Sequence, residues 1–302
     1  MRNTPKPPLE VTELFPFLSG REKITIRLHP RLNNSLELNQ SKLGGSFLWP
    51  ADEPWPTCED HKEAYIGILQ LRAKDFPEIE FPENSDLFQF LWCPIDDSYD
   101  FPEFLVFWRN ELKITNFLAE IPQPSHPNQN LVPNPCCLFP ERVAEYPDIQ
   151  EFNEIEEKDI ITWDKKNNYI YQSLLSTAPG CKIGGYPNWI QDLEIPICQC
   201  GNPMEHLLTI ASSEFDPSSA LRWCPIEDQN VWQESMRNLT LIRENPSLYQ
   251  DLETRIKIRE QAEIAAKAQV ASALTIGDCG SVYVFICRQC EGWPISSISQ
   301  CC

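Results

Sequence analysis

Two short pairs of cysteines in the C-terminal half of the sequence have the chemistry of a metal site. Cys198 and Cys200 form a C-x-C pair that is followed by Gly201. Cys287 and Cys290 form a C-x-x-C pair. Structural zinc ions are bound by four thiolates in a tetrahedron, usually from two short loops that the fold brings together. We therefore predict that these four cysteines bind one structural zinc ion.

Two alternatives to this ligand set stay open. The C-x-C spacing is tighter than the usual spacing in zinc sites, so Cys279 or His206 could replace one of the four cysteines. The cysteines could also be reduced, partly buried thiols. A disulfide framework is not expected, because 13 cysteines in 302 residues are far fewer than the about 8–10% that is typical of disulfide-rich secreted chains.

The sequence contains no motif of a conventional active site. No histidine stands in H-E-x-x-H or beside a nucleophile elbow, and a four-thiolate zinc site has no open position for a substrate. We therefore favour a protein without enzyme activity. The alternative is an enzyme that uses a cysteine nucleophile or a metal-bound water. A dyad of Cys58 with His61 is one such arrangement, because dyads form in space. The first candidates for that chemistry are Cys58, Cys93, His29, His61, His126 and His206.

The elements that must position these residues occur twice in the sequence. K-L-G-G at residues 42–45 is followed by Trp49, and K-I-G-G at residues 182–185 is followed by Trp189. The spacing from lysine to tryptophan is the same in both copies. Glycine permits a positive φ and a close approach of neighbouring backbone, so each motif predicts a tight turn with a tryptophan packed behind it. A phosphate-binding loop would need more glycines and a following helix.

Two further pairs of segments repeat in the same order. I-L-Q-L at residues 68–71 corresponds to L-L-T-I at residues 207–210, and residues 86–93 correspond to residues 280–287. These runs are short and apolar, aromatic or β-branched, which is typical of buried strands. We predict a β-rich α+β fold of two pseudo-repeated sheet units, with a helical insertion in the second unit.

The predicted organisation has three parts. Residues 1–145 form the N-terminal pseudo-repeat, residues 146–178 an acidic connector, and residues 179–302 the C-terminal pseudo-repeat. The insertion covers about residues 212–275. Its latter part is rich in Glu, Arg, Lys, Gln and Ala and ends before Gly277, which indicates a helix.

This predicted helix has an apolar side. Five residues fall near one helical face: Leu252, Ile256, Ile264, Ala268 and Ala271. We expect this face to cover a sheet, as the apolar stripe of a surface helix normally does. The alternative is a helix that binds a partner.

Charge limits the class of partner. The chain has 25 basic and 44 acidic residues, a formal net charge of −19, spread over both halves. Such a surface repels nucleic acid and favours a basic protein. No apolar run reaches the about 18 residues that a membrane helix needs. The first ten residues contain no apolar stretch of a secretory signal, so we expect a cytoplasmic protein.

These motifs resemble the DUF1963, or YwqG-like, family. The resemblance rests on the K-L-G-G motif with Trp49-Pro50 and Trp55-Pro56, on the strands that follow, and on the second K-I-G-G motif. It covers about residues 40–290. The resemblance implies no enzyme activity. It also implies that the protein belongs to bacterial gene neighbourhoods in which antitoxin-type immunity proteins occur.

The C-terminal half also resembles the C-terminal domain of the programmed-cell-death-2 group. In that group a knuckle that ends in Cys-Gly precedes a strand, and a later strand ends in C-x-x-C. Cys200-Gly201 and the pair Cys287 and Cys290 correspond to this pattern, whereas Cys198 is one residue too close to Cys200. The group is associated with binding a ribosomal protein, which is basic.

Together these observations predict a non-enzymatic protein-binding module of the YwqG-like type. Zinc would stabilise it, and its basic protein partner would be bound in a chaperone-like or immunity-like way. Binding energy concentrates in exposed aromatic or apolar anchors. We expect such a patch near Trp223, near Trp232 or on the helix around residues 252–271.

Overall fold

The structure is a computed structural model that describes residues 2–95 and 102–301. The chain forms two compact units, each made of three separate segments. Unit 1 contains Met1–His29, Phe139–Leu193 and Ser213–Ala271. Unit 2 contains Pro30–Leu138, Glu194–Ser212 and Ser272–Cys302. The domain boundaries predicted from the repeat describe internal similarity rather than compactness, and they stay a prediction.

Unit 2 contains an antiparallel sheet of six strands in the order β2-β7-β3-β4-β5-β6. The strands are β2 (Arg31–Leu32), β7 (Cys136–Cys137), β3 (Lys42–Leu43), β4 (Ile66–Arg72), β5 (Leu87–Trp92) and β6 (Phe104–Arg109). All six residues of β5 are buried, and the strand pairs with β4 on one edge and β6 on the other. The aromatic run at residues 86–93 is therefore a central strand, as its composition predicts.

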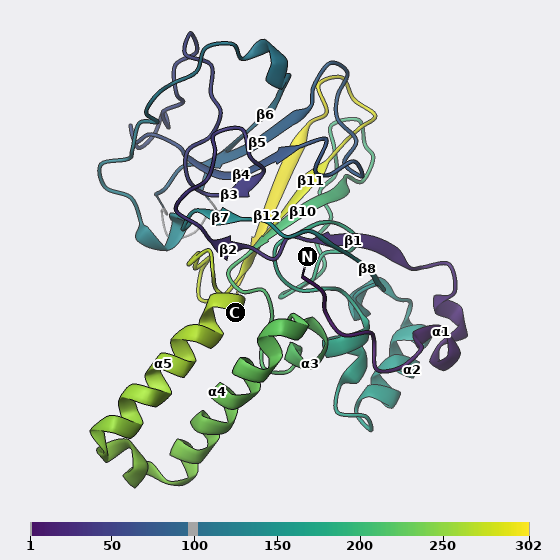
Figure 1. Cartoon of the computed structure of the whole chain (residues 1–302). Helices are drawn as coiled ribbons and strands as arrows, with labels where there is room; N and C mark the ends of the chain where they lie inside the picture. Colours follow the sequence, from purple (N-terminus) through teal and green to yellow (C-terminus); the bar gives the residue numbers. More distant parts are fainter. Residues whose placement is uncertain (1, 96–101, 302) are drawn as a thin grey trace. The chain divides into compact units, whose positions relative to one another are not determined.

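Unit 2 also contains three antiparallel strands that follow one another: β10 (Glu205–Ala211), β11 (Ser281–Ile286) and β12 (Ile295–Gln300) (Figure 1). β11 is buried along its whole length. The pairing of β10 with β11 shifts between His206 and Leu208, and that of β4 with β5 shifts between Gly67 and Leu69. Leu208 and Leu69 are matching positions of the predicted repeat, so both copies have their bulge at the same place.

Unit 1 contains the antiparallel strands β1 (Lys23–Arg27), β8 (Glu141–Glu145) and β9 (Lys182–Gly184), with β1 between the other two. Its α-helices are α1 (Val11–Leu14), α2 (Glu154–Asp164), α3 (Ala220–Trp223), α4 (Ile226–Glu244) and α5 (Leu252–Gln269). A π-helix covers Tyr171–Leu175, and 3₁₀ turns cover Pro16–Leu18, Ile149–Glu151 and Pro246–Gln250. Two more 3₁₀ turns, Glu111–Lys113 and Gln129–Leu131, belong to unit 2. The β-rich α+β class is confirmed.

The predicted acidic connector has a core of its own. α2 begins with a capping box, in which the Asn153 side chain accepts from the Glu156 N–H while Glu156 accepts from the Asn153 N–H. Ile160 and Tyr171 are completely buried in a cluster with α1. This segment is therefore part of folded unit 1, where it shares a core with α1 and the turn after it.

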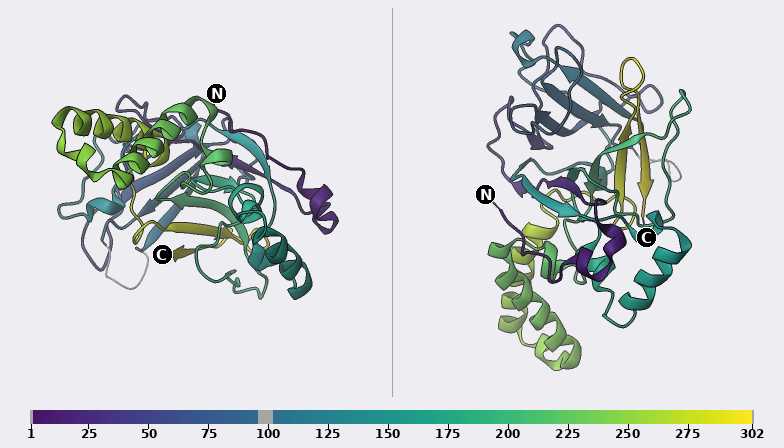
Figure 2. Two further views of the ribbon diagram at one scale, coloured as in Figure 1. Left: turned by 90° about the horizontal axis from the view of Figure 1, so that it is seen from below. Right: turned by 90° about the vertical axis from the view of Figure 1, so that its right-hand side faces the viewer.

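The insertion contains two helices, α4 and α5, that lie side by side as a hairpin (Figures 1 and 2). α5 starts at Leu252, as the sequence predicts. The apolar face does not cover a sheet, because Leu252, Ile256 and Ile264 are 64%, 51% and 50% exposed. The residues that pack are the small ones, Ala265 and Ala268, each 4% exposed. The expectation of a sheet-covering face is therefore wrong for this half of the helix.

The two tryptophans proposed as exposed anchors are buried. Trp223 is 1% and Trp232 is 7% exposed, and both lie in one core cluster with Ala265 and Ala268. Phe215 meets the Trp232 ring edge-on, with centroids 5.1 Å apart. These tryptophans fix the base of the helical hairpin, so neither is itself an exposed anchor.

Both Gly-Gly motifs form the turns that the sequence predicts. Gly44 and Gly45 have φ of +69° and +74°, and Gly184 and Gly185 have φ of +66° and +72°. A Cβ on Gly185 would lie 1.9 Å from the Glu145 carboxylate. Only glycine fits there. Among the described residues, no helix combines the length and the apolar character that crossing a bilayer requires.

Candidate metal centre

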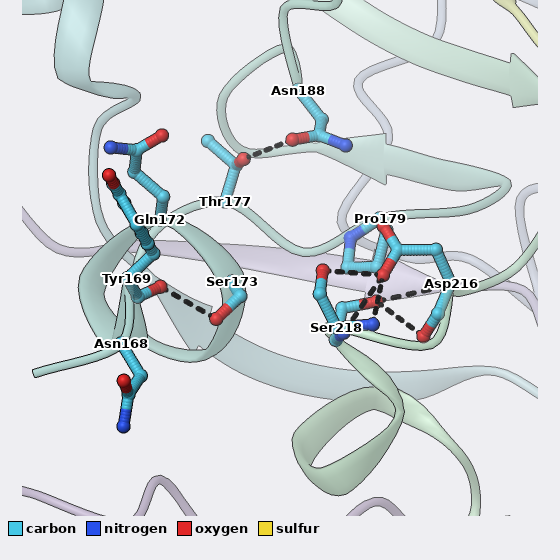
Figure 3. A pocket seen from close by; sticks show the side chains of 10 residues that line it. Asn168, Tyr169, Gln172, Ser173, Thr177, Pro179, Asn188, Asp216 and Ser218 are labelled. Atoms are coloured by element: carbon cyan, nitrogen blue, oxygen red, sulfur yellow. Dashed lines mark hydrogen bonds between the residues drawn. The ribbon is translucent and has the colours of Figure 1, made fainter.

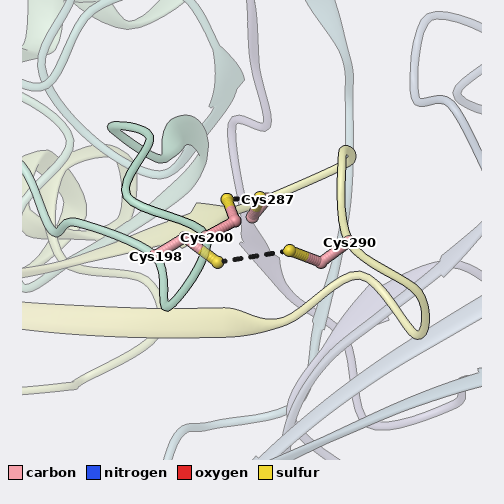
Figure 4. A group of neighbouring side chains, drawn as sticks. All are labelled: Cys198, Cys200, Cys287 and Cys290. Atoms are coloured by element: carbon pink, nitrogen blue, oxygen red, sulfur yellow. Dashed lines mark hydrogen bonds between the residues drawn. The ribbon is translucent and has the colours of Figure 1, made fainter.

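The four predicted cysteines lie together in unit 2 (Figure 4). Their sulfur atoms are all within 4.8 Å of one another. The Sγ atoms of Cys198 and Cys290 are 3.7 Å apart, and those of Cys200 and Cys287 are also 3.7 Å apart. These distances are far longer than the about 2.05 Å of a disulfide bond. The four thiols form a compact group that could hold a metal ion.

A tight hairpin just before β10 brings the first pair into position. Ile197 and Pro203 form an antiparallel bridge, and the Cys198 N–H donates to the Asn202 carbonyl at 2.9 Å. The Gly201 N–H donates to the Cys198 carbonyl at 2.8 Å, and Gly201 has a φ of +86°. The glycine after the second cysteine therefore permits the turn, and the C-x-C spacing is sufficient to aim both sulfurs to one side.

The second pair follows β11 directly. The Cys287 N–H donates to the Pro294 carbonyl at 2.9 Å, and the Trp293 N–H donates to the Cys290 carbonyl at 3.2 Å. This hairpin leads into β12. The two loops also contact each other, because the Asn202 side chain donates to the Gln289 Oε1 at 2.7 Å.

The thiols differ in acidity and exposure. Hydrogen bonding to the Asn202 backbone lowers the pKa of Cys200 to about 6. Hydrogen bonds with Cys200 and Cys198 raise the pKa of Cys290 to about 12. Ionisation of Cys200 is therefore favoured, whereas ionisation of a second thiol beside it is unfavourable. A bound cation reverses that effect, because it attracts each thiolate.

The alternative ligands take no part in this group. His206 is engaged by the Thr209 hydroxyl at 2.9 Å, and Cys279 is exposed. Neither contributes to the four-thiol cluster. The structure thus brings together the residues that the sequence selects and leaves out the two substitutes.

A family model, described as Domain of unknown function (DUF1963), matches residues 41–289. The chain belongs to the DUF1963 family. The match covers most of the sequence and contains both Gly-Gly turns, Cys198, Cys200 and Cys287, and it ends one residue before Cys290. Comparison with curated proteins gives no match. The resemblance to the programmed-cell-death-2 group stays a hypothesis.

This DUF1963 chain also brings the suspected dyad together. The Cys58 Sγ lies 3.4 Å from the His61 Nδ1. The Cys93 Sγ lies 3.3 Å from the same nitrogen, so the dyad is part of a group of three. Both cysteines are 1% exposed. The sequence indicated Cys58 with His61 as a possible dyad and Cys93 only as a separate candidate, so the group of three was not predicted.

A polar pocket of about 390 Å³ lies in unit 1 between the π-helix region and the loop before α3 (Figure 3). Its lining includes Thr177, whose hydroxyl donates to Asn188 at 2.8 Å. Asp216 is the carboxylate of the lining, and it accepts from the N–H and hydroxyl of Ser218 at 2.7 and 2.6 Å. These hydrogen bonds stabilise the turn that contains Asp216. The residues that line the pocket include no cysteine, no histidine and no pair of carboxylates that could serve catalysis.

A buried ion pair escaped the sequence analysis. Lys182 lies in β9 and donates to the carboxylate of Glu145, at the end of β8, at 2.9 and 3.1 Å. The same carboxylate accepts from the Ala178 N–H at 2.6 Å. Burial lowers the pKa of Lys182, and the Glu145 charge opposes that shift. The lysine of the K-I-G-G motif was visible in the sequence, but its partner was not.

Proposed function

We propose that this DUF1963 protein is a non-enzymatic binding module for a basic protein, with a structural zinc ion in the four-cysteine centre. The observation that carries the binding role is the exposed apolar ridge on α5. Leu252, Ile256 and Ile264 are each at least half exposed. Covering aliphatic side chains of this size removes apolar surface from water, which would stabilise a complex.

Zinc is the metal that best suits the four-cysteine centre. In a tetrahedral site with Zn–S bonds of about 2.3 Å, neighbouring sulfurs are about 3.8 Å apart. Two of the sulfur pairs of this site are 3.7 Å apart, and all four sulfurs lie within 4.8 Å of one another. Four thiolates fill the coordination shell and leave no position for a substrate, so the ion would stabilise the fold.

The ridge on α5 also has charge. Leu252, Ile256, Glu260 and Ile264 follow one another at intervals of four residues, so they lie along one side of the helix. Glu260 and the neighbouring Glu253 are exposed. Within this row Glu260 would meet a basic side chain of the partner between the apolar contacts. α5 as a whole has four basic residues, Arg255, Lys257, Arg259 and Lys267, and three acidic ones, so the row rather than the whole helix favours a basic segment.

An apolar groove of about 340 Å³ at the base of the hairpin extends the contact area. Its lining includes Leu221, Trp232 and Met236. Leu221 is 66% exposed, whereas Trp232 forms the buried floor. The net charge of −19 would speed the approach of a basic protein and oppose an acidic one.

The binding role is tested with affinity capture from the native cell at low and high salt, followed by mass spectrometry. We compare the wild type with the double variant Ile256→Glu and Ile264→Glu. The matched control is Leu112→Glu, at a residue of unit 2 that is 85% exposed. The expected result is a basic protein that is held by the wild type and the control and is lost from the double variant. The captured basic protein, once purified, should bind the wild-type chain again.

Capture of nucleic acid alone, or of a basic protein that the double variant retains, would contradict this function. The alternative function is catalysis by a cysteine or by a metal-bound water. Cys58 and Cys93 are the buried thiols nearest to a histidine, and at 1% exposure they are poorly placed to meet a substrate.

A further inference from the structure

Cys58, His61 and Cys93 form a second group with the donor atoms of a metal site. The three ligand atoms lie within 4.8 Å of one another. Both thiols are in hydrogen-bond range of a single nitrogen, the His61 Nδ1, at 3.4 and 3.3 Å. In a tetrahedral zinc site a thiolate sulfur and an imidazole nitrogen are about 3.6 Å apart, given bonds of about 2.3 and 2.0–2.1 Å. The observed distances are close to that value.

The loop that contains Cys58 is built like the loop that contains Cys198, with one residue more inside its bridge. Thr57 and Ala64 form an antiparallel bridge, as Ile197 and Pro203 do. The Cys58 N–H donates to the Glu63 carbonyl at 2.9 Å, which corresponds to the bond from Cys198 to Asn202 described above. Each loop precedes the bulged strand of its repeat.

The turn residues of the two loops also correspond. The Lys62 N–H donates to the Cys58 carbonyl at 2.9 Å, as the Gly201 N–H does to Cys198. Lys62 has a φ of +59°, in the left-handed region that Gly201 also occupies. A lysine rarely adopts this conformation. Each loop thus has a ligand-type residue directly before its left-handed position, His61 in one and Cys200 in the other.

Cys93 completes the correspondence. It follows β5 as Cys287 follows β11. The Cys93 N–H donates to the Glu103 carbonyl at 2.8 Å, and the Cys287 N–H donates to the Pro294 carbonyl at 2.9 Å. The first repeat therefore places two cysteines and a histidine where the second repeat places three of its four cysteines.

A carboxylate lies beside this group. The Glu103 Oε2 is 3.5 Å from the Cys58 Sγ, and the Tyr65 hydroxyl hydrogen-bonds the same carboxylate. Carboxylate oxygens bind zinc at about 2.0–2.2 Å. A hydrogen-bonded carboxylate next to the ligands is a common means of fixing a metal site.

We propose that Cys58, His61 and Cys93 bind a second zinc ion, with Glu103 beside its fourth coordination position. The site staples the loop of residues 57–64 to the end of β5. Two thiolates and an imidazole suit zinc better than calcium or magnesium, which require oxygen ligands.

The test is zinc stoichiometry of the full chain, purified under reducing conditions and dialysed against zinc without chelator. Elemental analysis should give two zinc ions per wild-type chain. His61→Ala should give one, and Cys287→Ser should give one through loss of the other site. Cys137→Ser, a partly buried cysteine of the same unit that is outside both groups, should still give two. Glu103→Gln should keep two ions but release one of them faster to a chelator.

Cobalt substitution keeps the test independent of stability. His61→Cys should bind the second ion that His61→Ala loses. Because it adds a third thiolate ligand, the thiolate-to-cobalt charge-transfer band of that site should be more intense than in the wild type. One zinc ion per wild-type chain, unchanged in His61→Ala, would overturn the proposal. A Cys58–Cys93 disulfide in freshly reduced, zinc-dialysed protein would overturn it as well.

Discussion

Lys182 and Glu145 form an ion pair in which both side chains are completely buried, with the Lys182 Nζ 2.9 Å from the Glu145 Oε2. Breaking such a pair by removing one partner leaves an uncompensated buried charge, which typically costs about 3–5 kcal/mol. We predict that Lys182→Met lowers the free energy of unfolding by about that amount. Urea unfolding followed by tryptophan fluorescence measures it.

The double variant Lys182→Met and Glu145→Gln is the control for this pair. The glutamine still accepts a backbone hydrogen bond and has no charge, so the double variant should be more stable than Lys182→Met alone. The cycle is completed by the single variant Glu145→Gln. If the stability losses of the two single variants add up to the loss of the double variant, the two side chains do not interact.

Lys42, the matching lysine of the first copy, donates to the carbonyls of Glu37 and Leu38 at 2.7 and 3.1 Å, and within residues 2–95 and 102–301 no carboxylate pairs with it as Glu145 pairs with Lys182. Burial lowers the pKa of Lys42 from 10.5 to about 8. Between these pH values the unfolded chain binds more protons at this residue, so the contribution of Lys42 to stability rises with pH. Above and below that window it is constant.

The measurement is urea unfolding of the wild type and Lys42→Met at pH 8 and pH 10. The stability difference, wild type minus variant, should increase over this range. Lys166→Met, at an exposed lysine of unit 1, should show no such change. A difference that falls as the pH rises is the opposite of this prediction.

Gly185→Ala should be more destabilising than Gly20→Ala. Both glycines have a positive φ, +72° and +79°, which costs a non-glycine residue about 1–2 kcal/mol. A Cβ on Gly20 would meet nothing within 4 Å, whereas one on Gly185 would lie 1.9 Å from the Glu145 Oε1. The additional loss of stability in Gly185→Ala, compared with Gly20→Ala, measures the cost of displacing the buried Glu145 carboxylate. Equal losses in thermal unfolding would count against this account.

Removal of metal from the four-cysteine centre should destabilise unit 2 more than unit 1. Structural zinc contributes about 10–16 kcal/mol of apparent binding energy at pH 7 in small peptides. We expect Cys287→Ser, or treatment with a strong chelator, to raise hydrogen exchange in β11 and β12 first. The core of Ile160 and Tyr171 in unit 1 should keep its protection. Simultaneous loss of protection in both units would refute a local role.

The sequence was sufficient to predict the four-cysteine centre, because each pair of cysteines is a short local motif that is visible before the pairing of β10 with β11 brings the two loops together. The second group was harder to see, because His61 and Cys93 are far apart in sequence and meet through the pairing of β4 with β5. The repeat contained the signal: Cys93 already matched Cys287. Following that match back to Cys58 and Cys198 would have predicted the group.

Other features depended on tertiary context. Glu145 reaches Lys182 because β1 pairs with both of their strands, which no local pattern shows. The apolar residues of α5 predicted a face that covers a sheet, but only its alanines, Ala268 and Ala271, are buried, whereas Leu252, Ile256 and Ile264 are exposed. Periodicity shows which residues share a face of a helix, but it does not show whether that face packs against a neighbour or is exposed to solvent.

The alternation of segments between the two compact units has a consequence for biosynthesis. Unit 1 acquires its last segment only at Ala271, and unit 2 still needs Ser272–Cys302 after that. Domains normally fold from the N-terminus as the ribosome delivers them, at about 5–20 residues per second. Here β1 must wait for β8 and β9, and β2 for β7, so neither unit can close its core until the C-terminal part of the chain has been synthesised.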